Sequence, residues 1–159
     1  MAENKRRGFE DPEYELLDTG IFDEDKYFDI FSEYAKKGDE DILIKVTAHN
    51  RGDEAKPLHI LPTLWFRNTW SWQKDAVKPH LKVYDSNQKF SVIQATHEDI
   101  GYRWLYCADV EGHGGTSLLF TENETKYERL FDTNNPSAYV KDGINHYVVH
   151  GDQEAIDSQ

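Results

Sequence analysis

Apolar and polar residues alternate over several short stretches of the chain, a pattern typical of strands with one buried face. From 42 to 48 every second residue is Ile, Val or Ala, while Lys45 and Thr47 occupy the opposite face. Residues 26–36 alternate similarly, except that Phe31 falls among the polar positions. The turn-forming sequence KGDED separates the two stretches, so together they predict a β-hairpin.

The same pattern continues along the chain and predicts an all-β fold. Nine short runs rich in β-branched and aromatic residues are candidate strands: 14–17, 26–36, 42–49, 58–66, 80–85, 89–97, 102–110, 116–122 and 146–151. Tight turns are expected at 98–101 and 111–115, whereas 123–143 is too long for a hairpin loop and has room for one short helix. Nine strands are enough for a two-sheet antiparallel β-sandwich.

Length and composition set the scale of this fold. A chain of 159 residues is expected to form one domain with a sizeable core. We expect that domain to span 13–151, between an N-terminal tail at 1–12 and a C-terminal tail at 152–159. The aromatic fraction of 13% is high beside a hydrophobic fraction of 38%, so the core must rely on large rings, which favours sheets.

Charge and cysteine content narrow the classes of partner and the compartment. A formal net charge of −12 would repel both phosphate backbones and anionic lipid headgroups, which argues against nucleic acid and membrane partners. No window approaches the roughly eighteen apolar residues of a membrane span, and the N-terminus has no apolar stretch of signal-peptide length. Cys107 is the single cysteine, so no disulfide can form within the chain, and a soluble cytoplasmic protein is expected.

The sequence LPTLWFRNTWSW at 61–72 is the densest aromatic stretch. A carbohydrate platform needs flat aromatic faces for the apolar side of a sugar ring and polar groups for its hydroxyls. Both are present, and the candidate residues are Trp65, Arg67, Asn68, Trp70 and Trp72. The alternative is that these tryptophans belong to a core or to a domain interface, and aromatic enrichment alone does not separate the two.

Other candidate chemistry is weaker, and no cofactor is expected. His146 and His150 would share one face of a helix, as a metal site requires, but HYVVH is β-branched and predicts a strand. In a strand the two rings would be roughly 13 Å apart, so no metal site is expected. Most acidic residues lie in predicted turns, where solvent keeps them ionised, and Cys107 has no catalytic signature around it.

Five stretches carry a resemblance to a known family. They are DPEYELLDTGIFDEDKYFDIFSEYAK, DILIKVTAHNRG, LHILPTLWFRNTWSW, LLFTENETKYERLF and AYVKDGINHYVVHG, and they span residues 8 to 151. In the same order they resemble the N-terminal region of large bacterial glucosidases related to glycoside hydrolase family 63. The resemblance implies a β-sandwich of the supersandwich type that precedes an (α/α)₆ barrel, in enzymes that hydrolyse α-glucosidic bonds with inversion.

The resemblance also implies where catalysis takes place. Members of the family carry their general acid and general base on the barrel, so no catalytic residue can be transferred to this chain. The chain is then expected to be a non-catalytic accessory domain that packs against the barrel and helps to shape its sugar-binding mouth. The alternative is a free-standing module that binds a gluco-oligosaccharide or a protein, and an interface left uncovered would favour self-association.

Overall fold

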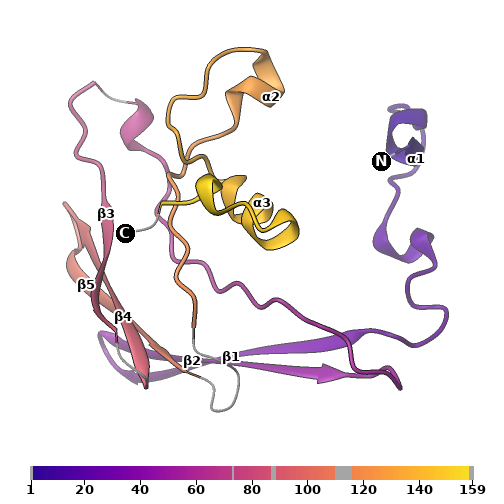
Figure 1. The fold of residues 1–159 in the computed structure, drawn as a ribbon, viewed down its shortest axis with the longest axis horizontal. Helices are drawn as coiled ribbons and strands as arrows, with labels where there is room; N and C mark the ends of the chain where they lie inside the picture. Colours follow the sequence, from indigo (N-terminus) through magenta and orange to yellow (C-terminus); the bar gives the residue numbers. More distant parts are fainter. Residues whose placement is uncertain (1, 73, 87–88, 110–115, 158–159) are drawn as a thin grey trace. The chain divides into compact units, whose positions relative to one another are not determined.

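The computed structural model describes residues 2–72, 74–86, 89–109 and 116–157. The described chain is mostly β, with two small antiparallel sheets and a few short helices (Figure 1). It divides into two compact units, one up to His59 and one from Ile60 onward, and each is described by itself. None of the helices in the described ranges is long and apolar enough to cross a membrane. The expected turn at 111–115 lies outside the described residues.

The first unit is built on a β-hairpin. Its elements are α1 (Ala2–Arg6), η1 (Leu16–Thr19), β1 (Phe28–Gly38) and β2 (Asp41–Asn50). The two strands pair antiparallel, with Ile30 opposite Ala48 and Tyr34 opposite Ile44. This register places the apolar positions of both strands on the same face of the hairpin. The hairpin predicted from the alternation and the KGDED turn is therefore confirmed.

The opposite face of the hairpin is largely polar. Lys45 pairs with Glu33 across the strands at 3.4 Å, and Asp29 forms an ion pair with Arg51. Phe31, the apolar exception in the alternation, meets the imidazole of His49 edge to face at 5.7 Å between ring centroids. The exception is thus accommodated by a cross-strand ring contact.

The second unit contains a three-stranded antiparallel sheet in the order β3-β4-β5. Its strands are β3 (His80–Ser86), β4 (Phe90–His97) and β5 (Gly101–Ala108). The central strand β4 carries most of the buried apolar side chains of the described chain, because Val92, Ile93 and Ala95 are all buried. The predicted strands at 80–85, 89–97 and 102–110 are confirmed apart from their ends, and the predicted turn at 98–101 joins β4 to β5.

Short helices accompany this sheet in the second unit. They are η2 (Trp70–Trp72), α2 (Tyr127–Phe131), α3 (Gly143–His150) and η3 (Gln153–Ala155). The helix expected within 123–143 is confirmed as α2. The strand predicted at 146–151 is wrong, because those residues belong to α3 and its cap.

The helical conformation of α3 has local causes. Gly151 follows the helix with a left-handed φ of 69°, and its N–H donates to the carbonyl of Tyr147 at 2.9 Å, which satisfies a helix-end acceptor. At the other end, Gly143 packs so closely on the Ala155 carbonyl that a Cβ would lie 2.0 Å from that oxygen. End capping and packing therefore override the strand preference of two adjacent valines.

Three further strand predictions are wrong for a shared reason. Residues 14–17 lead into η1, and 58–66 has no strand assignment. Within 116–122, Phe120 makes an isolated bridge to Asp157 and no longer ladder forms. A strand requires hydrogen bonds to a neighbour as well as an apolar pattern. In the described ranges none of these segments is a strand of either sheet.

Candidate functional site

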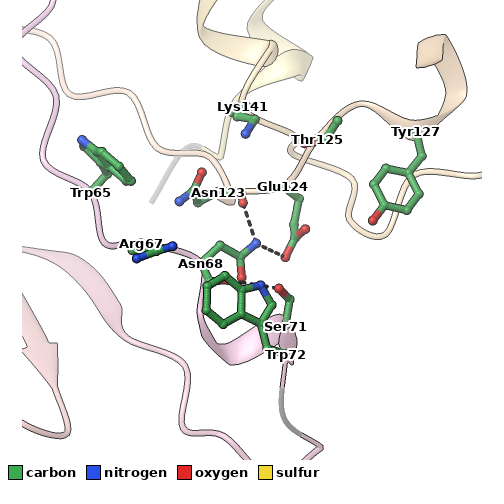
Figure 2. Close-up of a pocket in the computed structure, with 10 residues that line it drawn as sticks. All are labelled: Trp65, Arg67, Asn68, Ser71, Trp72, Asn123, Glu124, Thr125, Tyr127 and Lys141. Atoms are coloured by element: carbon green, nitrogen blue, oxygen red, sulfur yellow. Dashed lines mark hydrogen bonds between the residues drawn. The ribbon is translucent and has the colours of Figure 1, made fainter. Parts of the chain in front are cut away.

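An open cleft of about 400 Å³ lies in the second unit, between the stretch 65–72 and the segments around 123–127 and 141 (Figure 2). The residues that line it are Trp65, Arg67, Asn68, Ser71, Trp72, Asn123, Glu124, Thr125, Tyr127 and Lys141. The lining therefore combines three aromatic rings with charged, amide and hydroxyl groups. This composition is that of a site for a polar ligand with some apolar surface.

Hydrogen bonds from two asparagine side chains join the two walls of the cleft. The amide nitrogen of Asn68 donates to the backbone carbonyl of Asn123 at 2.9 Å and to the carboxylate of Glu124 at 3.1 Å. In return, the amide nitrogen of Asn123 donates to the backbone carbonyl of Phe66 at 2.8 Å. These reciprocal bonds, which we call the asparagine clamp, join segments more than fifty residues apart in sequence. All its members are partly buried, so water competes weakly with them.

A third segment, residues 139–141, supports the cleft wall formed by residues 123–127. The N–H of Glu122 donates to the carbonyl of Tyr139 at 2.8 Å, and the N–H of Lys141 donates to the carbonyl of Glu124 at 3.0 Å. Residues 139–141 lead directly into α3, whose first residue packs on Ala155. Backbone pairing thus connects the position of Glu124 in the cleft to the packing of α3.

The opposite wall, formed by residues 65–72, carries an indole and a guanidinium in contact. The guanidinium carbon of Arg67 lies 5.0 Å from the ring centroid of Trp72, within the range of a cation–π interaction. Ser71 donates from its hydroxyl to the Asn68 carbonyl at 3.0 Å, which closes the turn that carries Trp72. Trp72 is nevertheless 66% exposed and Trp65 is 62% exposed, so both indoles offer free surface to a ligand.

One polar atom in the cleft region is left without a bond. The side-chain carbonyl oxygen of Asn68 is buried and accepts no hydrogen bond from any described residue. Its amide nitrogen already donates both bonds of the asparagine clamp, so turning the amide over would break both of them. A water molecule or a ligand hydroxyl is the kind of donor that would satisfy this oxygen.

The structure brings together four of the five candidate residues predicted from the sequence. Trp65, Arg67, Asn68 and Trp72 line the cleft, whereas Trp70, the half-buried first residue of η2, does not. Sequence reasoning missed the whole opposite wall, which consists of Asn123, Glu124, Thr125, Tyr127 and Lys141. No periodicity or motif links positions 68 and 123, so only the three-dimensional contact reveals their pairing.

Other groups bear on metal binding and catalysis. Because α3 is a helix, the rings of His146 and His150 lie 5.6 Å apart between centroids, in place of the wide separation expected for a strand. No described residues form a group of three or more His, Cys, Asp or Glu that could hold a metal ion. Burial raises the pKa of the Cys107 thiol, and the nearby charge of Asp109 adds to that effect. Less of the Cys107 side chain is therefore expected as thiolate at neutral pH than for a free cysteine.

Comparison with known proteins shows a similarity to a yeast protein. The chain is 30% identical over 185 aligned residues to the uncharacterized protein YMR196W of Saccharomyces cerevisiae. The alignment covers all of this chain but 17% of the yeast protein, so the chain spans about a sixth of the length of that relative. No family model matches the chain, and no solved structure matches it significantly.

Proposed function

We propose that this chain is a non-catalytic N-terminal accessory domain of a cytoplasmic α-glucosidase similar to those of glycoside hydrolase family 63. It is a two-sheet antiparallel β-sandwich that packs against a catalytic (α/α)₆ barrel and helps to shape the sugar-binding mouth of the enzyme. One observation carries the proposal: the cleft sets two exposed indoles beside a guanidinium, an ammonium, a carboxylate and two amides.

This set of groups suits a pyranose ring. The faces of Trp65 and Trp72 can cover the apolar C–H side of a sugar, because indole rings offer large flat surfaces. Arg67 and Lys141 supply hydrogen-bond donors, and Glu124 supplies an acceptor for hydroxyls. The unpaired carbonyl oxygen of Asn68 adds a further acceptor close to the clamp.

The same cleft supports binding without hydrolysis. Hydrolysis of a glycosidic bond ordinarily requires two carboxylic groups on either side of that bond, one as acid and the other as base or nucleophile. Among the described residues that line the cleft, Glu124 alone carries a carboxylate, and it already accepts a bond from Asn68. The chain is thus expected to hold a sugar that another domain cleaves.

Two observations favour a larger assembly of the sandwich type. The yeast relative extends far beyond the matched region, so this stretch of sequence occurs as a small part of a much longer protein. Both small sheets also expose large apolar side chains, among them Ile44 on β2 and Trp104 on β5. Sheets in a sandwich cover such faces by packing against one another or against a neighbouring domain.

The proposal is tested by fluorescence titration of the purified chain. All four tryptophans lie in the second unit, and two of them line the cleft. We expect α-linked gluco-oligosaccharides to lower iodide quenching of the wild type, and Trp72→Ala to abolish most of that protection. Trp104→Ala is the matched control, since it removes an exposed indole outside the cleft and should leave the protection unchanged. Quenching that no sugar alters, with a silent calorimetric titration, would refute sugar binding.

The alternative of a free-standing carbohydrate-binding module is favoured by one feature. Every described residue that lines the cleft belongs to the second unit, so these walls form without a group from another chain. Micromolar affinity of the 159-residue chain alone would favour the module. Millimolar affinity that improves when the chain is joined to a longer partner would favour the accessory domain. Turnover of α-glucosides by the chain alone would contradict both.

A further inference from the structure

Helix α3 carries two histidines one turn apart. His146 and His150 are four positions apart, and residues at that spacing are neighbours on the surface of a helix. Their ring centroids lie 5.6 Å from one another. The expectation that no metal site lies here depended on a strand, which would have separated the rings widely. The helix removes that reason, because two histidines four positions apart on one helix face can bind the same zinc ion.

The separation of the two rings is close to that of imidazoles bound to one metal ion. An imidazole nitrogen binds zinc at about 2.0–2.1 Å, which places the ion roughly 3.2 Å from the centroid of the ring. Two such rings at a tetrahedral angle have centroids about 5.2 Å apart. The observed separation of 5.6 Å is only slightly larger, and a small rotation about the side-chain bonds of either residue closes the difference.

The backbone that carries both histidines is held in place by hydrogen bonds. The N–H of His146 donates to the carbonyl of Asp142 at 3.1 Å. The last turn closes where the N–H of Gly151 donates to the carbonyl of Tyr147 at 2.9 Å. Among the described residues, neither imidazole takes part in a hydrogen bond or an ion pair, so the ring nitrogens are available to an ion. Binding an ion would therefore cost little additional ordering of the chain.

The charges around the end of α3 favour a cation. The last carbonyl groups of a helix carry partial negative charge, and His150 is the last residue of α3. The whole chain carries a formal net charge of −12, which attracts cations. The carboxylate of Asp142, one turn before His146, lies 3.8 Å from the guanidinium of Arg129 and is engaged there. The two imidazoles are thus the ligands that the helix offers.

We propose that His146 and His150 form a two-ligand site for a divalent transition metal, with water in the remaining coordination positions. Imidazole nitrogen suits Zn²⁺, Ni²⁺ and Cu²⁺, whereas Mg²⁺ and Ca²⁺ take oxygen ligands. The ion ties one turn of α3 to the next, so it binds the helical chain more tightly than an extended one and stabilises the helix. The site shares no residue with the cleft, and it requires no sugar.

Calorimetric titration of the full chain with ZnCl₂, in a buffer that does not bind metals, tests the site. The variant His150→Gln removes one of the two ligands at an exposed position, and its affinity for zinc should fall by about tenfold or more. His80→Gln is the matched control, because it removes an exposed histidine from β3 and should leave the affinity unchanged. In the wild type, Cu²⁺ should bind more tightly than Zn²⁺.

A second variant tests the spacing on the helix at constant composition. The double substitution Asn145→His with His146→Asn keeps every residue type but places the two histidines five positions apart, roughly 140° around the helix axis. We expect this exchanged variant to lose affinity for zinc as His150→Gln does. Zinc should also raise the urea midpoint of the wild type and leave the midpoints of both variants unchanged.

Three results would overturn the proposal. Equal affinity of the wild type and His150→Gln would show that zinc binds elsewhere. Undiminished binding by the exchanged variant would show that the two histidines do not act as a pair on one helix face. A silent titration with both Zn²⁺ and Cu²⁺ would show that the rings make only an edge-to-face contact. If the exchanged variant does not fold, the comparison with His150→Gln decides, because that position is exposed.

Discussion

Gly143 is the position where one added methyl group should do most damage. It is the buried first residue of α3, and the ideal Cβ of an alanine there would lie 2.0 Å from the carbonyl oxygen of Ala155. The same Cβ would lie 3.1 Å from the carbonyl carbon of Ala155 and 3.4 Å from the side-chain methyl carbon of Thr121. The nearest neighbour is backbone, so no side chain can rotate away, and α3 must move from η3 to make room.

The cost of Gly143→Ala can be worked from two opposing effects. Forcing a methyl group into a well-packed position typically destabilises a protein by about 1–3 kcal/mol. Alanine recovers some of this, roughly 0.5–1 kcal/mol, because it restricts the unfolded chain more than glycine does and favours the helix. The contact is far shorter than any real packing distance, so we take the penalty near the upper end of its range, and after the gain from alanine the net destabilisation is about 2 kcal/mol.

Urea unfolding followed by tryptophan fluorescence measures this effect in the right unit, since all four tryptophans lie after residue 59. With an m-value of roughly 1–3 kcal/mol/M, the midpoint should fall by about 1 M. Asn145→Ala is the matched control, because it introduces alanine at an exposed position of the same helix. This substitution should be neutral or slightly stabilising. Equal midpoints for the wild type and Gly143→Ala would refute the close packing of α3 on η3.

Two other substitutions give independent readings. Asn123→Ala removes the donor to the Phe66 carbonyl and should destabilise the second unit by about 1–2 kcal/mol in the same urea assay, while also weakening any sugar binding; an unchanged midpoint would contradict the asparagine clamp. Burial and Asp109 both raise the pKa of the Cys107 thiol, so less thiolate is present at pH 8 and its reaction with a disulfide reagent should be slower than that of an unstructured cysteine peptide. Asp109→Asn should increase the rate, and a rate equal to that of the peptide in native buffer would contradict the assigned burial.

The predictions from sequence succeeded where a pattern is local and strict. Residues 42–48 alternate with little ambiguity and a clear turn precedes them, so their strand and its hairpin follow from side-chain direction alone. The three strands of the second sheet were likewise visible in their β-branched and aromatic runs. In each of these cases the partner strand is a neighbour in sequence, and pairing is decided by a short turn.

The incorrect predictions concern segments whose structure depends on contacts between residues that are far apart in sequence. Residues 146–151 read as a strand because of Val148 and Val149, but the helix is decided by Gly151 and by the contact of Gly143 with Ala155. The stop signal of Gly151 was available in the sequence, whereas the contact with η3 was not. The opposite wall of the cleft was missed for the same reason, since a hydrogen bond from Asn68 to a residue fifty-five positions away leaves no local trace.

The asparagine clamp also bears on covalent modification of the chain. Asn123, Glu124 and Thr125 form the triplet that directs attachment of an N-linked glycan. The nitrogen that would carry the glycan is the one that donates to the Phe66 carbonyl, in a partly buried site. A glycan on that nitrogen would place a bulky, hydrated group where two segments must close on one another. A glycosylated amide nitrogen keeps one N–H, so the conflict is one of space: attachment of a glycan at Asn123 is expected to hinder closure of the cleft wall.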